Sequence, residues 1–260
     1  MANSINTNVG ALVALQNLNA TSRDLNVTQN RVNTGMKVAT AKDNGAIFAI
    51  ATNQRAEMGA LDAVKQSIQR GQSIVDVALA AGETVVAALT EMKSLAVAIE
   101  ADGTTTSDAY TALKADYDAL QEEITQALEN AKFDGVNLWS DTGKTVKVNT
   151  SDTNDTFDIG LAAAQTATPA GVTAKEVDDA IKLFTADLAT LGTQSKSLER
   201  MATFTGKMQD ALEAGVGNLV DADLAKESAR LTALQTKQQL GVQALSIANQ
   251  SSSMLLGLFR

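Results

Sequence analysis

The stretch that decides the fold covers residues 61–99 and reads LDAVKQSIQRGQSIVDVALAAGETVVAALTEMKSLAVAI. Apolar residues or glycines recur in it at alternating steps of three and four, twelve times without a fault. The twelve positions are Leu61, Val64, Ile68, Gly71, Val75, Ala78, Gly82, Val85, Leu89, Met92, Ala96 and Ile99. A seven-residue repeat of this length predicts a helix with one continuous apolar seam and left-handed supercoiling against its partners. We expect Gly71 and Gly82 to let a partner backbone come close, because glycine has no Cβ.

Two more runs with the same spacing predict partner helices for this seam. They are Tyr110, Leu113, Tyr117, Leu120, Ile124, Ala127 and Ala131, and then Val177, Ile181, Phe184, Leu188, Leu191, Ser195, Leu198 and Ala202. Between them, KTVKVN (144–149) and FDIGL (157–161) alternate with period two, which predicts a β-hairpin near 144–161. The predicted fold is therefore mainly α: a long antiparallel, coiled-coil-like helical bundle with a small β-hairpin.

The composition restricts the possible functions. The 260 residues carry a net charge of −9, which argues against a basic surface for nucleic acid. The chain contains no cysteine and no histidine, so thiolate chemistry is excluded and both the commonest general base and the commonest zinc ligand are missing. We therefore predict a protein that is not an enzyme and that has no cofactor, no metal site and no catalytic residue.

Both ends of the chain lack charge. Residues 1–22 and 238–259 contain no Asp, Glu, Lys or Arg. Nine of the last 22 uncharged residues are Gln, Asn or Ser, which is too polar for a membrane-spanning helix, so no membrane insertion is expected. The first residues also lack the basic region of a secretory signal peptide, and we expect any export to proceed without a cleaved one.

The two ends are predicted to be helical and to associate. Leu15, Leu18, Ser22, Leu25, Gln29, Val32 and Met36 follow the 3/4 spacing at the first end. The other end carries two such stripes: Leu234, Gln238, Gly241, Leu245 and Ala248, and Leu240, Ala244, Ile247, Ser251, Met254 and Leu258. A helix that is apolar on two faces must be enclosed by neighbours. Pairing the ends would bury one stripe of each and leave the others exposed for association, although a self-contained bundle is the alternative.

The ends also resemble a known family. SINTNVGALVALQNLNAT (4–21) and RVNTGMKVATAKDNGAIFAIA (31–51) resemble the amino-terminal signature of bacterial flagellins, and VDADLAKESARLTALQTKQQLGVQALSIANQSSSMLLGLFR (220–260) resembles their carboxyl-terminal one. The resemblance covers roughly the first 130 and the last 85 residues. Asp43-Asn44 replaces the usual pair of acids, and the short middle is similar to the compact flagellins of alphaproteobacteria.

The resemblance implies an architecture and a function. Residues 1–43 with 221–260 would form an inner paired-helix domain that lines a filament channel, and residues 44–220 an outer helical rod with the hairpin. The chain would be a secreted structural subunit that polymerises into the extracellular flagellar filament used for swimming. Its implied partners are itself, other flagellins, hook-associated junction and cap proteins, and a flagellin export chaperone. The alternatives are a hook-filament junction protein and a non-flagellar coiled-coil scaffold.

Apolar side chains of the two ends are the predicted polymerisation interface. They are Ile5, Leu12, Leu15, Leu18, Leu25, Val32, Leu240, Leu245, Ile247, Met254, Leu255, Leu256, Leu258 and Phe259. Asp221, Asp223 and Glu227 could suggest paired catalytic carboxylates, but their position near a helix start favours a structural role beside the positive end of the helix.

Overall fold

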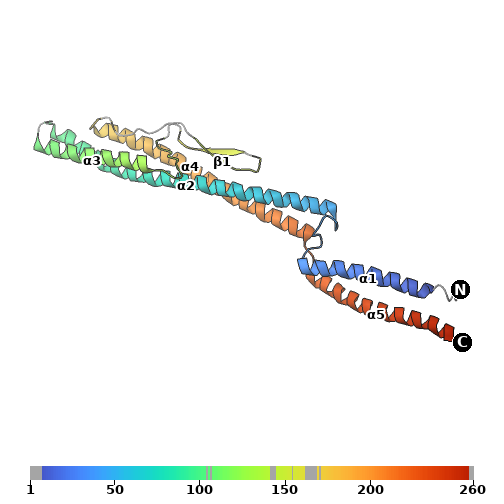
Figure 1. The fold of residues 1–260 in the computed structure, drawn as a ribbon. Coiled ribbons are helices and arrows are strands. Elements are labelled where there is room, and N and C mark those ends of the chain that lie inside the picture. The colour runs from blue at the N-terminus through green and yellow to red at the C-terminus, as the bar shows by residue number, and fades with distance from the viewer. Residues whose placement is uncertain are drawn as a thin grey trace. The chain divides into compact units, whose positions relative to one another are not determined.

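The computed structural model describes residues 8–257 except 104, 106, 141–144, 154, 162–168 and 170, and for 251–257 it describes the helix but not the side chains. Within these residues the elements are α1 (Val9–Thr34), α2 (Gly45–Asp102), α3 (Asp108–Asn130), β1 (Val146–Asn149), β2 (Thr156–Ile159), α4 (Ala174–Val220) and α5 (Leu224–Gly257) (Figure 1). They form two compact units: unit 1 is Met1–Ala56 with Leu212–Arg260, and unit 2 is Glu57–Ala211. The mainly α class with one small antiparallel sheet confirms the predicted fold.

Polar side chains fix the helix starts. Asn8 accepts a hydrogen bond from the Ala11 N–H at the start of α1, and Ser107 accepts one from the Tyr110 N–H at the start of α3. Asp223 accepts one from the Lys226 N–H at the start of α5. Each side chain satisfies one of the N–H groups that a helix start leaves without a partner. Gly35 ends α1 in the left-handed region at φ 72°, which glycine adopts without a steric penalty.

The core of unit 2 follows the predicted seam. All twelve seam positions of residues 61–99 are buried along α2. From α3, Tyr117 and Ile124 are buried in the same core, and from α4 Phe184 and Leu191. The Tyr117 hydroxyl donates to the Gly171 carbonyl at 2.9 Å, and burial raises the pKa of Tyr117. The three predicted stripes therefore form one continuous apolar core, as the heptad spacing predicts.

The hairpin packs against this core. β1 and β2 are antiparallel, with Val146 opposite Ile159 and Val148 opposite Phe157. Val148 and Ile159 are buried while Lys147 and Asp158 are exposed, so the alternation in the sequence directs one face of the hairpin inward.

The two seam glycines of α2 lie where other elements pack closely against the helix. A Cβ on Gly71 would lie 2.6 Å from the Val148 side chain, and one on Gly82 would lie 2.6 Å from both Leu188 and Trp139. The close neighbours are therefore side chains of the hairpin region and of α4, which fill the space that each glycine leaves.

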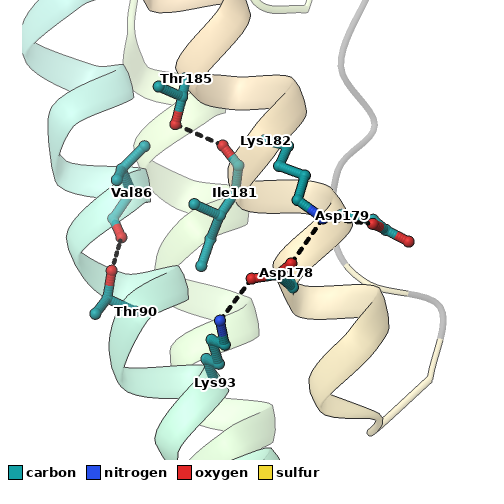
Figure 2. Close-up of polar contacts among 8 residues, drawn as sticks. All are labelled: Val86, Thr90, Lys93, Asp178, Asp179, Ile181, Lys182 and Thr185. Atoms are coloured by element: carbon teal, nitrogen blue, oxygen red, sulfur yellow. Dashed lines mark hydrogen bonds and ion pairs between the residues drawn. The ribbon is translucent and has the colours of Figure 1, made fainter.

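An ionic cluster joins α2 to α4 on the surface of unit 2. Lys93 Nζ lies 2.5 Å from Asp178 Oδ1, and Lys182 Nζ lies 2.8 Å from Asp178 Oδ2 (Figure 2). Hydrogen bonds from Lys182 and then Lys93, together with their charges, lower the pKa of Asp178 to about 2. The two cations therefore keep this carboxylate ionised to a lower pH than an ordinary aspartate.

By length and composition α2 is the one helix in the described part of the chain that could cross a membrane. Its apolar seam is instead packed in the core of unit 2 against α3, α4 and the hairpin. A buried central helix of a bundle passes the same composition test, so the finding is weak evidence for a membrane span.

Candidate functional site

The helix pair of unit 1 carries most of the residues predicted for the interface. α1 and α5 pack side by side along their lengths (Figure 1). The Leu18 side chain would lie 3.2 Å from a Cβ placed on Gly241, so the helices approach closely at this glycine. Near the ends of the pair, the Asn8 side-chain amide donates to the Ala248 carbonyl at 2.8 Å. The two ends of the sequence are thus neighbours in the structure.

α5 presents three faces, which can be read from burial and residue type. Leu234 is buried and Gln238, Gly241, Leu245 and Ala248 are half-buried, and these form the face toward α1. A second face, formed by Leu240, Ala244 and Ile247, is apolar and exposed, with exposed fractions of 59% for Leu240 and 67% for Ile247. A third face is exposed and polar, and consists of Gln239, Gln243, Ser246 and Gln250. At 3.6 residues per turn the three faces are roughly 120° apart.

α1 divides its apolar residues in the same way. Leu18, Leu25 and Val32 are half-buried, whereas Leu12 and Leu15 are exposed, Leu12 by 57%. Val9, Val13 and Val27 are exposed as well. Each helix of the pair therefore keeps an apolar face that nothing in the single chain covers within the described residues.

The remaining predicted interface residues lie beyond what the structure describes. Ile5, Leu258 and Phe259 fall outside the described residues. Met254, Leu255 and Leu256 belong to α5, but their side chains are outside the description.

An ion pair joins the last turn of α1 to the first turn of α5, and the sequence did not predict it. Arg31 Nη1 lies 3.2 Å from Glu227 Oε1, and Glu227 is only 8% exposed. Next to this pair, the Lys37 and Val38 N–H groups both donate to the Val220 carbonyl, and the Ala222 N–H donates to the Gly35 carbonyl. These bonds join the segment after α1 to the segment before α5. The pair spans 196 positions of sequence, so no local pattern could indicate it.

The acidic residues near the start of α5 have separate structural positions. Asp223 caps the helix, Glu227 pairs with Arg31, and Asp221 forms an isolated β-bridge with Met36. They do not form a paired-carboxylate site. No group of three or more potential metal ligands occurs among the residues that the structure describes.

Two family models match this chain at the two regions that flank the hairpin. The model of the bacterial flagellin N-terminal helical region matches residues 5–144, and that of the bacterial flagellin C-terminal helical region matches residues 174–259. The chain belongs to the bacterial flagellin family. The predicted family is thereby confirmed.

Relatives match this flagellin along its whole length. Flagellin FljM and flagellin FljK of Caulobacter vibrioides are each 52% identical to it, with 99% of both chains covered. A flagellin of Brucella melitensis is 36% identical, again with 99% of both chains covered. The chain is accordingly a structural subunit of the flagellar filament, a component that lies outside the cell.

Proposed function

We propose that this flagellin polymerises through the exposed apolar faces of α1 and α5. The single observation that carries the proposal is the second apolar face of α5, where Leu240 and Ile247 are exposed although another face of the same helix packs against α1. Covering such side chains stabilises a contact by roughly 1.5–3 kcal/mol each. The exposed members of the predicted set, together with those whose side chains lie outside the description, form this interface between copies, whereas its half-buried members pack between α1 and α5.

The proposal extends to the architecture of the filament. Residues 1–43 and 221–260 form the inner domain, and residues 44–220 form the outer rod. The polar face of α5 lines the channel, because Gln and Ser side chains hydrogen-bond water and carry no charge that would hold a passing chain. The acidic charge, absent from residues 238–259, is concentrated in the rod, which faces water.

The partners and chemistry follow from the same reasoning. The subunit is exported through the flagellar type III channel with the help of a flagellin export chaperone. It then contacts other flagellins and the hook-associated junction and cap proteins. It is not an enzyme, a conclusion supported by the absence of cysteine and histidine from the sequence. The relatives named above are flagellins, which does not favour a junction protein or a coiled-coil scaffold.

The test introduces one carboxylate on two neighbouring faces of α5. Ile247→Asp places a charge in the apolar face, and we expect it to abolish filaments because a buried, unpaired carboxylate is strongly unfavourable. Ser246→Asp places the same charge one residue away on the polar face, and we expect it to polymerise. Electron microscopy and sedimentation of the purified chains measure assembly. Filaments of normal length from Ile247→Asp would contradict the interface, and a native chain that never polymerises would contradict the function.

A further inference from the structure

The segment that connects α1 to α2 ends at an asparagine that precedes a glycine. Asn44 and Gly45 are both exposed, and they form the one Asn-Gly pair in the sequence. An asparagine can lose its side-chain amide when the main-chain nitrogen of the next residue attacks its Cγ. A glycine at that next position has no Cβ to hinder the attack. A Cβ placed on Gly45 would have no atom within 4 Å, so no other group crowds this peptide bond from that side.

The start of α2 places the two reacting groups next to each other. Asn44 caps the helix: its Oδ1 accepts a hydrogen bond from the Ile47 N–H at 3.1 Å, and its main-chain carbonyl accepts one from the Phe48 N–H at 2.9 Å. The Gly45 N–H belongs to the first turn, whose N–H groups have no acceptor within the helix. Among the described residues, no group accepts a hydrogen bond from it. The attacking nitrogen is therefore accessible, and the amide is fixed beside it.

The hydrogen bond that caps the helix also activates the amide. As the Gly45 nitrogen attacks Cγ, negative charge develops on Asn44 Oδ1, and the Ile47 N–H already donates to that oxygen. A donor that is fixed where charge develops stabilises the transition state. The positive end of the α2 dipole lies at the same place and favours the developing negative charge. The cap therefore promotes the reaction as well as starting the helix.

Hydrogen bonds also hold the turn that precedes Asn44. Asp43 Oδ2 accepts hydrogen bonds from the Ala39 N–H at 3.1 Å and from the Thr40 N–H at 2.9 Å. The Thr40 hydroxyl donates to the same oxygen at 3.1 Å. The main chain is thus fixed by this turn before Asn44 and by α2 after it. Any change in the length of the main chain at Asn44 must be accommodated by the cap itself.

We propose that Asn44 is a site of spontaneous deamidation, which converts it to aspartate and isoaspartate. The Gly45 nitrogen bonds to Asn44 Cγ and loses its proton to water, while the side-chain nitrogen takes up a proton and leaves as ammonia. The product is a cyclic succinimide, which water then opens. Cleavage of the bond from the Gly45 nitrogen to Cγ gives aspartate. Cleavage of the bond from that nitrogen to the main-chain carbonyl carbon gives isoaspartate. Water is the only other reactant.

The two products differ in their effect on α2. Aspartate keeps an oxygen for the Ile47 N–H and adds a negative charge at the positive end of the helix, which stabilises the helix. Isoaspartate adds a methylene group to the main chain and turns the carbonyl that accepts from Phe48 into a side-chain carboxylate, so the cap is lost. Because the filament lies outside the cell, its subunits are beyond cytoplasmic turnover, and the modification accumulates with the age of a subunit.

Two aspartates that precede glycines provide internal references. They are Asp102 before Gly103 and Asp134 before Gly135. Their carboxylates are poorer electrophiles than an amide and have no ammonia to lose. Asp134 Oδ2 also lies 2.6 Å from Arg70 Nη2, which holds the carboxylate in an ion pair. We therefore expect less isoaspartate at both positions than at Asn44.

The test follows residue 44 in the folded chain. The purified native chain is incubated in a mildly alkaline buffer, which favours loss of the proton from the attacking nitrogen, and trypsin then releases residues 43–55. Mass spectrometry detects the replacement of NH₂ by OH in this peptide. Isoaspartyl methyltransferase with labelled S-adenosylmethionine detects isoaspartate. We expect both signals at residue 44, together with faster hydrogen exchange at the start of α2 in the isoaspartate form.

Two variants and one comparison make the result specific. Gly45→Ala adds the missing Cβ without a clash, and Asn44→Ser keeps a capping oxygen without an amide. Circular dichroism should show that both variants fold. We expect the first to lose most of the signal and the second to lose all of it. An unchanged residue 44 in the folded native chain, an undiminished rate in Gly45→Ala, or a reaction that occurs only in urea would overturn the proposal.

Discussion

The two units of this flagellin use apolar side chains in opposite ways. Among the described residues, unit 2 contains 26 of the 31 buried apolar residues, and unit 1 contains five: Val38, Ala51, Val216, Val220 and Leu234. Exposed large apolar residues show the reverse, with ten of 14 in unit 1 and four in unit 2. Unit 2 thus completes its core within one chain, whereas unit 1 leaves much of its apolar surface exposed.

The difference shows that similar periodicity can serve two purposes. In unit 2 the apolar seam positions from Val64 to Ile99 belong to one core with buried side chains of α3, α4 and the hairpin. In unit 1 two helices pack on each other, and a pair of helices has too few neighbours to cover two apolar faces on each. Substitutions in unit 2 should therefore change the stability of the monomer, and substitutions on the outer faces of unit 1 should change assembly.

The largest expected change in the free energy of unfolding comes from a substitution in the core of unit 2. Phe184 is fully buried, and its ring centroid lies 5.2 Å from that of Trp139. Phe184→Ala should lower the free energy of unfolding by about 3–5 kcal/mol because it leaves a cavity. The adjacent Leu183 is 54% exposed, so Leu183→Ala should change it by less than about 0.5 kcal/mol. Urea unfolding of the monomer, monitored by circular dichroism, measures the free energy of unfolding of both variants. Equal losses would contradict the comparison.

A smaller effect is expected in unit 1. Arg31→Gln leaves the buried Glu227 carboxylate without its cation. We expect a cost of about 1–3 kcal/mol, which is the typical range for a buried polar group that loses its partner. Hydrogen exchange should become faster in peptides of α1 and α5 and stay unchanged in residues 57–211. Arg23→Gln, at an exposed position of the same helix, is the control. Faster exchange throughout unit 2 would show that the units are not separate in stability.

The smallest expected effect on stability is the loss of the Asp178 ion pairs at low pH. The pKa of Asp178 is lowered from 3.8 to about 2, so its ionic contacts stabilise the folded chain fully above pH 4 and are lost as the pH falls toward 2. Asp178→Asn should therefore lower the melting temperature slightly at pH 7, and the difference from the native chain should disappear near pH 2. Asp179→Asn, which removes only a 3.3 Å contact with Lys182, should have a smaller effect. A difference independent of pH would contradict the ionic explanation.

Much of the fold could be predicted because its determinants are local. The steps of three and four in residues 61–99 identify the buried side of α2 position by position, and the alternation around Val148 and Ile159 identifies the buried face of the hairpin. The two stripes of α5 likewise separate the face toward α1 from the exposed face. Periodicity shows which residues lie on the same face of a helix or strand. The residues of one face become buried together when the elements pack.

What could not be predicted depends on contacts between distant segments. Nothing near Arg31 indicates its pairing with Glu227, and Gly82 carries no sign that Trp139 and Leu188 occupy the space beside it. The units also divide inside α2 and α4, where the helical pattern continues without a break. Such features arise from side-chain shape and register across helices, which a single sequence does not encode in any fixed spacing.

The position of Trp139 has a consequence for spectroscopy. It is the single tryptophan of the chain, it is buried, and its indole N–H donates to the Ala78 carbonyl at 2.8 Å. Both tyrosines, Tyr110 and Tyr117, also belong to unit 2. Tryptophan and tyrosine fluorescence and absorbance therefore report on unit 2 alone, while unit 1 contributes to the far-ultraviolet signal of helices without any tryptophan or tyrosine emission of its own. Recording both signals in one titration separates the unfolding of the two units without a label.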